Sequence, residues 1–140
     1  MLTVAYQRLG GEESSADTVY QVVEVIRDGL PVIFFERGTE LLGVTRQDYA
    51  SLIGLRLSEV QLAKKRNIRL SSSSSERILM ISNLVILCDD YFGDIEKRNR
   101  WLNRPNLTLG NMPPLAICDT AMGISLVNDI ITRMKLGFAA

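Results

Sequence analysis

Residues 45–66 of this chain read TRQDYASLIGLRLSEVQLAKKR, and the spacing inside this stretch decides how it folds. The apolar residues at the spacing of a shared helix-turn-helix core are Tyr49, Ile53, Leu55 and Val60. The small residue Ala50 allows two helices to approach closely, and Gly54 supplies the turn that lets two short helices cross at a steep angle. We therefore predict a helix-turn-helix whose second helix covers residues 58–66.

Each helix of this motif has a sequence typical of a helix start. Thr45 is followed three residues later by Asp48, and Ser58 is followed three residues later by Gln61. In a capping box the first side chain accepts a hydrogen bond from the amide three residues on, and the side chain there bonds back to the first amide. Both pairs resemble capping boxes, so we expect the helices to begin at Thr45 and Ser58.

The charges of the chain are unevenly distributed. Of its 140 residues, 16 are Lys or Arg and 16 are Asp or Glu, so the net charge is zero. A neutral total argues against a uniformly basic nucleic-acid-binding protein, but it does not say where the charges lie. Residues 46–77 carry seven basic and three acidic residues, a net charge of +4, whereas residues 1–45 carry −4. The positive charge therefore coincides with the predicted helix-turn-helix.

This coincidence favours operator DNA as a partner. In such motifs the second helix places side chains against base edges in the major groove, while flanking cations contact phosphates. The outward positions of the second helix are Ser58, Gln61, Leu62 and Lys65. The candidate DNA-binding residues are Arg46, Gln47, Arg56, Ser58, Gln61, Lys64, Lys65, Arg66 and Arg69.

An alternative to DNA binding stays open at this point. Helix-turn-helix folds also serve as helical protein–protein interaction modules, and any three-helix bundle can reproduce the spacing. The Lys64–Arg66 run could be a solvated helix end, because cations favour the last turn of a helix. Glu59 would be repelled by phosphates, although a carboxylate can accept a hydrogen bond from N4 of cytosine.

Composition argues against an enzyme. The chain has no histidine, which excludes Ser-His-Asp and Cys-His sites. Neither a P-loop nor a Gly-x-Gly-x-x-Gly stretch occurs. Cys88 and Cys118 lie in apolar helical patterns, and two cysteines without histidine make no zinc site. We therefore expect buried thiols and no catalytic residue, metal or cofactor. Without a signal peptide or an apolar run of about 18 residues, we expect a cytoplasmic protein that does not enter a membrane.

Helical periodicity continues through the first half of the chain. Residues 1–16 are expected to have a loose structure without a defined element. Asp17 precedes apolar residues at helical spacing, which predict a capped amphipathic helix ending at Gly29. Residues 32–35 have the composition of a strand, but the pattern that continues to Gly43 favours a helix. With no convincing strand pair, we predict an all-α fold.

The second half divides into further helices. Ser71–Ser75 is expected to be a linker or exposed loop. A long helix is predicted over 76–92, and Asp94 should cap a helix that stops before Pro105. Two more helices are expected, divided at Gly123, over Pro113–Met122 and Ser125–Gly137. The expected domains are a variable segment with one helix (1–30), the helix-turn-helix domain (31–75) and a helical region (76–140).

A family resemblance adds to these predictions. The motif Trp-Leu-x-x-Pro-Asn occupies 101–106, and it is followed by Gly110-x-x-Pro113, Thr120-x-x-Gly123 and Gly137. In this combination, together with the helix-turn-helix, residues 40–140 resemble the Xre/MbcA/ParS-type antitoxins. One departure is Met112, which stands where the family usually has a Ser or Thr cap. Losing that cap costs about 1 kcal/mol unless Asn111 replaces it.

The resemblance implies a partner and a mode of action. It implies an antitoxin paired with a RES-domain toxin, an NAD-depleting enzyme, with the helix-turn-helix serving operator binding and autoregulation. It also implies a homodimer within a larger toxin–antitoxin complex, whose C-terminal region covers the active site of the toxin. On this chain the implied toxin-binding residues are Arg133, Met134, Lys135, Leu136, Gly137, Phe138, Ala139 and Ala140. The alternative is an interaction module or stand-alone transcriptional regulator without a toxin.

Overall fold

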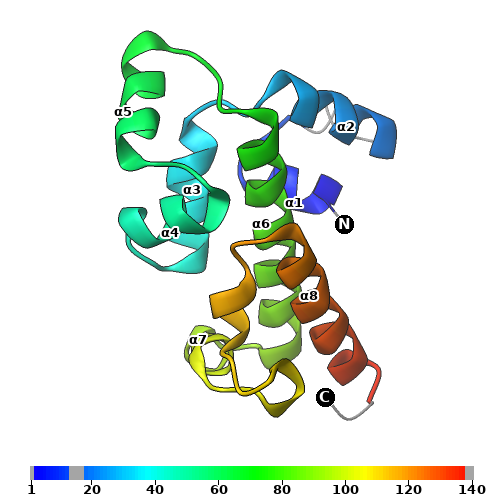
Figure 1. The fold of residues 1–140 in the computed structure, drawn as a ribbon. Helices are drawn as coiled ribbons and strands as arrows, with labels where there is room; N and C mark the ends of the chain where they lie inside the picture. The colour runs from blue at the N-terminus through cyan, green and yellow to red at the C-terminus, as the bar shows by residue number, and fades with distance from the viewer. Residues whose placement is uncertain (1, 13–17, 138–140) are drawn as a thin grey trace. The chain divides into compact units, whose positions relative to one another are not determined.

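The computed structural model describes residues 2–12 and 18–137, and in these residues the chain folds into eight α-helices and two short 3-10 helices (Figure 1). No strand lies within this part of the chain, so the predicted all-α class is confirmed. The chain forms two compact units, one ending at Asn83 and the other beginning at Leu84. The domain limits expected from sequence remain a prediction.

The first unit contains most of the helices. They are α1 (Leu2–Arg8), α2 (Val19–Asp28), α3 (Ile33–Leu42), α4 (Arg46–Ile53), α5 (Leu57–Arg66) and the first part of α6 (Ser72–Phe92). The expectation of a loose start was wrong for α1, where seven residues form a helix. The predicted amphipathic helix is α2, and Thr18 caps it through a capping box with Gln21. Asp17 lies outside the described residues.

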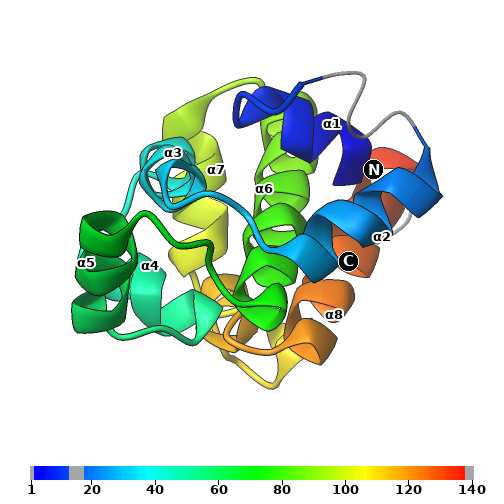
Figure 2. The same cartoon turned by 90° about the horizontal axis from the view of Figure 1, so that it is seen from above.

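The segment over 32–35, ambiguous between strand and helix, is helical. It belongs to α3, which ends at Gly43 with a positive φ of 77°. Such a left-handed residue closes a helix without strain when it is glycine. The same device ends α4 at Gly54, where φ is again 77°. Viewed from above, α3, α4 and α5 lie beside one another as a three-helix cluster (Figure 2).

The core of this cluster follows the predicted spacing. Tyr49, Ala50 and Val60 have no exposed surface, and Ile53 is 1% exposed. Phe35 of α3 meets Tyr49 edge-on with ring centroids 5.5 Å apart. A β-carbon at Gly38 would overlap the Tyr49 phenol, so glycine there permits the close approach of α3 and α4. Burial also raises the pKa of Tyr49 well above its ordinary value. The helix-turn-helix geometry is thus confirmed.

The expected serine linker is instead the start of α6. The helix begins at Ser72, and the Ser71 hydroxyl caps it by accepting from the Ser74 amide at 3.2 Å. Ser74 and Ser75 are buried, and the side chain of each forms a hydrogen bond with a backbone group far away in the sequence. Ser74 donates to the Ile53 carbonyl at 3.0 Å, and Ser75 accepts from the Leu30 amide at 2.8 Å. Composition alone suggested a loop, but these long-range bonds stabilise a helix.

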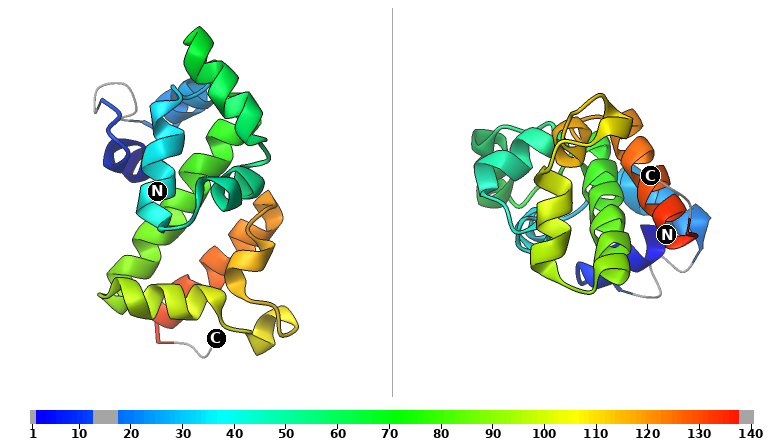
Figure 3. Two further views of the ribbon diagram at one scale, coloured as in Figure 1. Left: turned by 90° about the vertical axis from the view of Figure 1, so that its left-hand side faces the viewer. Right: turned by 90° about the horizontal axis from the view of Figure 1, so that it is seen from below.

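The second unit is built on the end of α6. Its other elements are α7 (Ile95–Asn103), η2 (Leu107–Leu109), η3 (Pro114–Ile117) and α8 (Ala121–Lys135) (Figure 3). As predicted, Asp94 caps α7, which ends before Pro105. The predicted division at Gly123 was wrong, because Thr120 caps α8 by accepting from the Gly123 amide at 2.9 Å. Pro113 precedes η3 without any side-chain cap, so Asn111 does not replace the missing one.

Candidate functional site

The candidate site in the first unit is the exposed side of α5. Ser58, Gln61, Leu62 and Lys65 are all exposed, as predicted. The predicted helix start at Ser58 was wrong, because Arg56 is the N-cap and Ser58 lies inside the first turn. The Glu59 carboxylate accepts from the Arg56 amide at 3.2 Å and from its Nε at 3.1 Å. These hydrogen bonds from Arg56 lower the pKa of Glu59, which keeps this carboxyl ionised.

Three of the candidate cations already bind other groups of the chain. Arg46 forms an ion pair with Glu36 at 2.8 Å and lies 5.6 Å from the centre of the Phe35 ring. Arg56 pairs with Glu59, as described above. Arg69 donates to the Gly29 carbonyl at 3.0 Å and so ties the segment after α5 to the end of α2. These arginines stabilise the local fold, and a phosphate would have to compete with their present partners.

The last turn of α5 differs in this respect. Lys64, Lys65 and Arg66 are exposed, and among the described residues none of their side chains forms a hydrogen bond or ion pair. Asn67 ends the helix in a left-handed conformation, with φ of 52°. Gln47 is exposed in the first turn of α4. Within the part of the chain that the structure describes, a cationic cluster without side-chain partners therefore lies at the end of the helix that carries Ser58 and Gln61.

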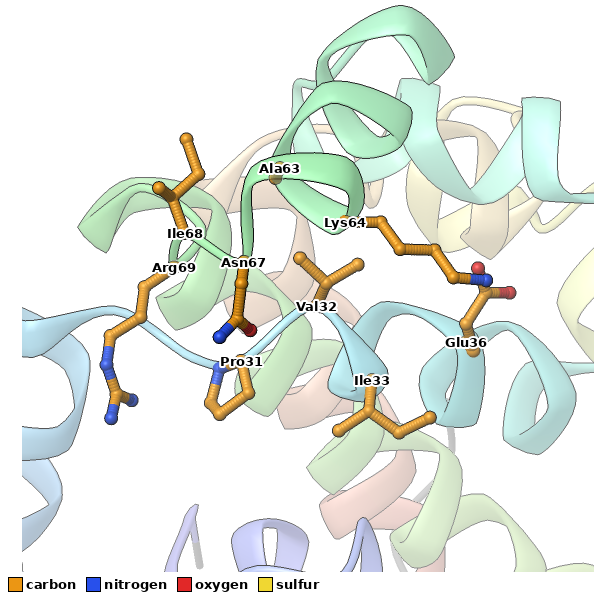
Figure 4. Close-up of a pocket in the computed structure, with 9 residues that line it drawn as sticks. All are labelled: Pro31, Val32, Ile33, Glu36, Ala63, Lys64, Asn67, Ile68 and Arg69. Atoms are coloured by element: carbon orange, nitrogen blue, oxygen red, sulfur yellow. The ribbon is translucent and has the colours of Figure 1, made fainter.

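A pocket of about 430 Å³ lies where the end of α5 meets the start of α3 (Figure 4). Its polar lining includes Lys64, Asn67 and Arg69 together with Glu36. Its apolar lining includes Ile33, 48% exposed, and Ile68, 51% exposed. Sequence reasoning missed these two isoleucines, although Ile68 stands out as an apolar residue within a cationic run. The lining therefore mixes charged, polar and apolar side chains.

The second candidate region is the end of α8. Arg133 and Leu136 are exposed, Met134 is partly buried, and Gly137 has a positive φ of 85°. Lys135 forms an ion pair with Asp90 of α6, which anchors the last turn of α8 to its own unit. Phe138, Ala139 and Ala140 lie outside the described residues. Of the predicted toxin-binding residues, Arg133 and Leu136 are thus the ones whose side chains the structure leaves most available.

Sequence reasoning missed two exposed apolar residues on the same helix. Met122 is 77% exposed and Leu126 is 48% exposed, on the side of α8 that faces away from its buried residues. The signal that could have revealed them is their spacing of four residues, which places them on one helical face. Their neighbours Gly123, Ile124 and Val127 are buried and gave the stronger periodicity.

The motif that carries the family resemblance serves to shape a loop. Trp101 packs at a tilt against Phe92, with ring centroids 5.8 Å apart. The Asn106 side chain accepts from the Thr108 amide at 2.9 Å, and its backbone amide donates to the Met112 carbonyl at 3.1 Å. These bonds close the loop over 106–112 on itself. These residues of the motif therefore determine the geometry of the loop.

The two thiols are part of the core of the second unit. Cys88 and Cys118 have no exposed surface, as predicted, and neither forms a disulfide. Burial raises the pKa of each thiol to about 12, and the nearby Asp89 and Asp119 carboxylates add to the shifts of Cys88 and Cys118 respectively. The Cys118 thiol also donates to the Pro114 carbonyl at 3.3 Å. Such thiols are poor nucleophiles at neutral pH.

Two classes of feature are absent from the described residues. No group of three or more Cys, Asp or Glu side chains there is arranged to hold a metal ion. Within the same ranges, 2–12 and 18–137, no helix combines the length and the apolar character that crossing a bilayer requires.

Comparison with known families divides the chain at nearly the same place as its compact units. Residues 21–83 match the family model described as the antitoxin Xre-like helix-turn-helix domain. Residues 88–137 match the model described as the antitoxin Xre/MbcA/ParS C-terminal toxin-binding domain. The two matches meet within α6 and together span most of the chain.

Several curated proteins are similar over most of their length. A protein named Antitoxin Xre from Pseudomonas putida is 21% identical over 119 residues, covering 85% of this chain and 74% of the relative. Another Antitoxin Xre, from Photorhabdus laumondii, is 23% identical over 117 residues, covering 83% of this chain and 79% of the relative. A Prs ADP-ribosylating antitoxin from a Sphingobium species is 25% identical over 124 residues, covering 82% of this chain and 78% of the relative.

Proposed function

Because the chain belongs to the Xre/MbcA/ParS family of antitoxins, we propose that it neutralises an NAD-depleting RES-domain toxin and represses its own operon. The proposal has two parts, one for each domain. The C-terminal unit binds the toxin and covers its active site, and the helix-turn-helix binds operator DNA. The chain itself supplies no catalytic group to either process.

The toxin-binding part rests on the second unit. The family model of a toxin-binding domain extends to Gly137, which includes all of α8. Lys135 in the last turn of α8 forms an ion pair with Asp90 of α6, directly before the residues that follow the helix. We propose that residues 133–140 reach the active-site cleft of the toxin and exclude its substrate.

The relative from Sphingobium supports an NAD-consuming partner. Its name includes the term ADP-ribosylating, and ADP-ribosylation takes the ADP-ribose group from NAD. A RES-type toxin that depletes NAD uses the same dinucleotide. We therefore propose that the cleft covered by this chain is an NAD-binding cleft.

The DNA-binding part rests on one observation above all. Lys64, Lys65 and Arg66 are exposed in the last turn of α5 and, within the described residues, bind no other side chain. Cations in this state can contact phosphates without first breaking an ion pair, and each contact releases a counterion from DNA. Ser58 and Gln61 would then face the base edges from the first half of α5.

Repression of this kind requires two copies of the motif. Helix-turn-helix repressors bind two half-sites about 34 Å apart, one on each copy of the recognition helix. We propose that the chain acts as a homodimer within a larger complex with its toxin. Operator binding would place it in the cytoplasm.

Co-expression with the product of the adjacent reading frame tests the proposal. We expect that product alone to lower cellular NAD and stop growth, and co-expression of the full chain to prevent both effects. Deleting residues 134–140 should abolish protection while operator binding, measured on the same preparation, is unchanged. Full protection by the truncated chain would refute the covering role of the tail. A harmless neighbouring product that does not co-purify would favour a stand-alone regulator.

A further inference from the structure

Helix α8 buries one apolar face in its own domain and exposes further large apolar residues on another side. Val127 and Ile131 have no exposed surface, and Ile130 is 6% exposed. On the other side of the helix Met122 and Leu126 are 77% and 48% exposed, and Leu136, the C-cap residue that follows the helix, is 69% exposed. The second face is therefore not needed for the core of the unit.

The exposed residues form one continuous stripe. Met122, Leu126, Asp129, Arg133 and Leu136 follow each other at intervals of four, three, four and three residues, and all five are exposed. At about 100° per residue, this spacing keeps every member within about 40° of one line along the helix. We call these five residues the outer seam. With a rise of about 1.5 Å per residue, the outer seam is about 21 Å long.

The spacing of the outer seam is the one that helices use to pack lengthwise. Alternating steps of three and four residues place side chains where they insert between the side chains of a facing element. Large apolar groups aligned on a surface indicate a binding site more often than isolated ones do. A partner that contacts the outer seam must therefore run along α8.

We propose that the outer seam is a docking surface for the toxin, so that α8 lies lengthwise on the toxin while the tail covers the active site. This inference rests on the proposed function. The toxin-binding family model includes the whole of α8, and the C-terminal end of the outer seam, Arg133 and Leu136, belongs to the segment that we propose to reach the cleft. A partner that holds the tail is adjacent to the outer seam by the connectivity of the chain.

The charges in the outer seam define what the partner surface must offer. Asp129 and Arg133 stand between the apolar groups, one helical turn apart. The matching surface is an apolar groove with a basic group opposite Asp129 and an acidic group opposite Arg133. Charges of opposite sign at fixed positions set the register and direction of α8 in that groove.

Substitutions that add charge to the outer seam test the inference. In the double variant Met122→Glu with Leu126→Glu, we expect the affinity for the purified toxin from the adjacent reading frame to fall about tenfold or more. The milder variant Leu126→Ala should weaken binding by a factor of about three to ten if Leu126 is an interface anchor. Circular dichroism and thermal unfolding verify that α8 is intact.

The matched control is Ala121→Glu with Thr132→Glu. Both positions are exposed on α8 but lie about 80° to 100° around the helix from the line of the outer seam. The control adds the same charge to the same helix, and we expect its affinity for the toxin to stay within about twofold of the full chain, as for a surface change outside the interface.

Three results would overturn the inference in distinguishable ways. If the seam variants bind the toxin as the full chain does while the tail deletion still abolishes protection, the proposed function stands and the outer seam has no part in it. If light scattering shows that the seam variants lose a dimer but keep toxin affinity, the outer seam binds a second copy instead. If the full chain does not bind the toxin, the proposed function and the inference both fail.

Discussion

The carbonyl oxygen of Ile117 occupies the space that a β-carbon on Gly123 would need. Gly123 is buried in the first turn of α8, and its amide donates to the Thr120 hydroxyl at 2.9 Å. The end of η3 and the start of α8 therefore pack backbone against backbone. Glycine permits this contact because it has no side chain, although elsewhere in a helix it is less favourable than alanine.

Replacing Gly123 with alanine should destabilise the protein. In an unconstrained helix Gly→Ala stabilises by about 0.5–1 kcal/mol. Here the new methyl group must displace the Ile117 backbone, and overpacking of this kind costs about 1–3 kcal/mol. We expect the free energy of unfolding, measured with urea, to fall by about 2 kcal/mol. The control Ser125→Ala lies on the exposed side of α8 and should change stability little; a more stable Gly123→Ala variant would contradict the proposed contact.

Removing the Asp89 carboxylate should destabilise the second unit. Arg98 is 2% exposed, and one of its terminal nitrogens donates to both Asp89 oxygens, at 2.8 and 3.0 Å. A buried guanidinium that loses its counter-charge is left desolvated, so we expect Asp89→Ala to cost about 3 kcal/mol. Chemical denaturation of the full chain measures the change.

An exposed pair of the same type is the control for this experiment. The side chains of Arg27 and Glu24 are 67% and 47% exposed and lie 3.2 Å apart. Because water screens this pair, Arg27→Ala should cost less than about 0.5 kcal/mol. We also expect Asp89→Leu with Arg98→Met to be less harmful than Asp89→Ala alone, since no buried charge remains. Equal costs for the buried and exposed pairs would mean that burial of Arg98 is unimportant.

The buried thiols should make stability depend on alkaline pH. The pKa of Cys88 and Cys118 rises from 9.0 to about 12 in the folded chain. Between these values the unfolded chain loses thiol protons that the folded chain keeps, so raising the pH favours unfolding. Stability contributed by these groups is complete below about pH 9 and is lost progressively towards pH 12. The melting temperature as a function of pH measures this effect.

A variant without the thiols separates their contribution from that of other groups. Cys88→Ala with Cys118→Ala should lower stability at neutral pH but show a shallower decline above pH 9, the ordinary pKa of a thiol. Tyr49, whose pKa burial also raises, stays in both proteins and accounts for the remaining decline. If both proteins lose stability with the same slope, the thiols do not titrate as the structure implies.

Charge reversal at the end of α5 should weaken operator binding. In Lys65→Glu with Arg66→Glu, two exposed cations without partners among the described residues become repulsive towards phosphate. We expect a lower affinity at every salt concentration, and a salt slope reduced by about 0.9 for each phosphate contact that is lost. Fluorescence anisotropy with the upstream DNA of the operon, over a range of salt concentrations, measures both quantities.

The control for DNA binding makes the same charge change in the second unit. Lys97 and Arg100 are exposed on α7, outside the basic window. Lys97→Glu with Arg100→Glu should therefore leave the salt slope nearly unchanged. If both double variants reduce affinity equally, DNA responds to net charge alone and α5 has no special role.

Local signals in the sequence were enough to predict the helix-turn-helix. Thr45, Gly54 and the apolar spacing around Tyr49 act within one or two helical turns. Thr45 caps α4 by accepting from the Asp48 amide, without the return bond of a capping box, Gly54 ends α4, and Tyr49 is buried. The start of α5 was misplaced by two residues because Ser58 is a good cap by composition. Arg56 is the actual cap, since its amide and Nε both bind Glu59.

Because sequence signals are local, they also misled the predictions for the helices further along the chain. Ser71–Ser75 has the composition of a linker, but Ser74 and Ser75 bind the backbone of Ile53 and Leu30, residues far away in the chain. Gly123 looks like a helix break, but the nearby Ile117 backbone makes glycine necessary within α8. In both cases a tertiary contact, which the periodicity of the sequence does not reveal, overrides the local preference for a loop or a helix break.

The amino-acid sequence by itself thus determined the all-α class, the helix-turn-helix, the basic window and the buried thiols, because short-range spacing and composition dictate these features. Only the tertiary structure decided which cations are free, since the partners of Arg46 and Arg69 lie in other segments. The periodicity of α8 already favours burial of Val127 and Ile131. Only the packing of its unit shows that Met122 and Leu126 stay exposed, because no other element of the described chain covers them.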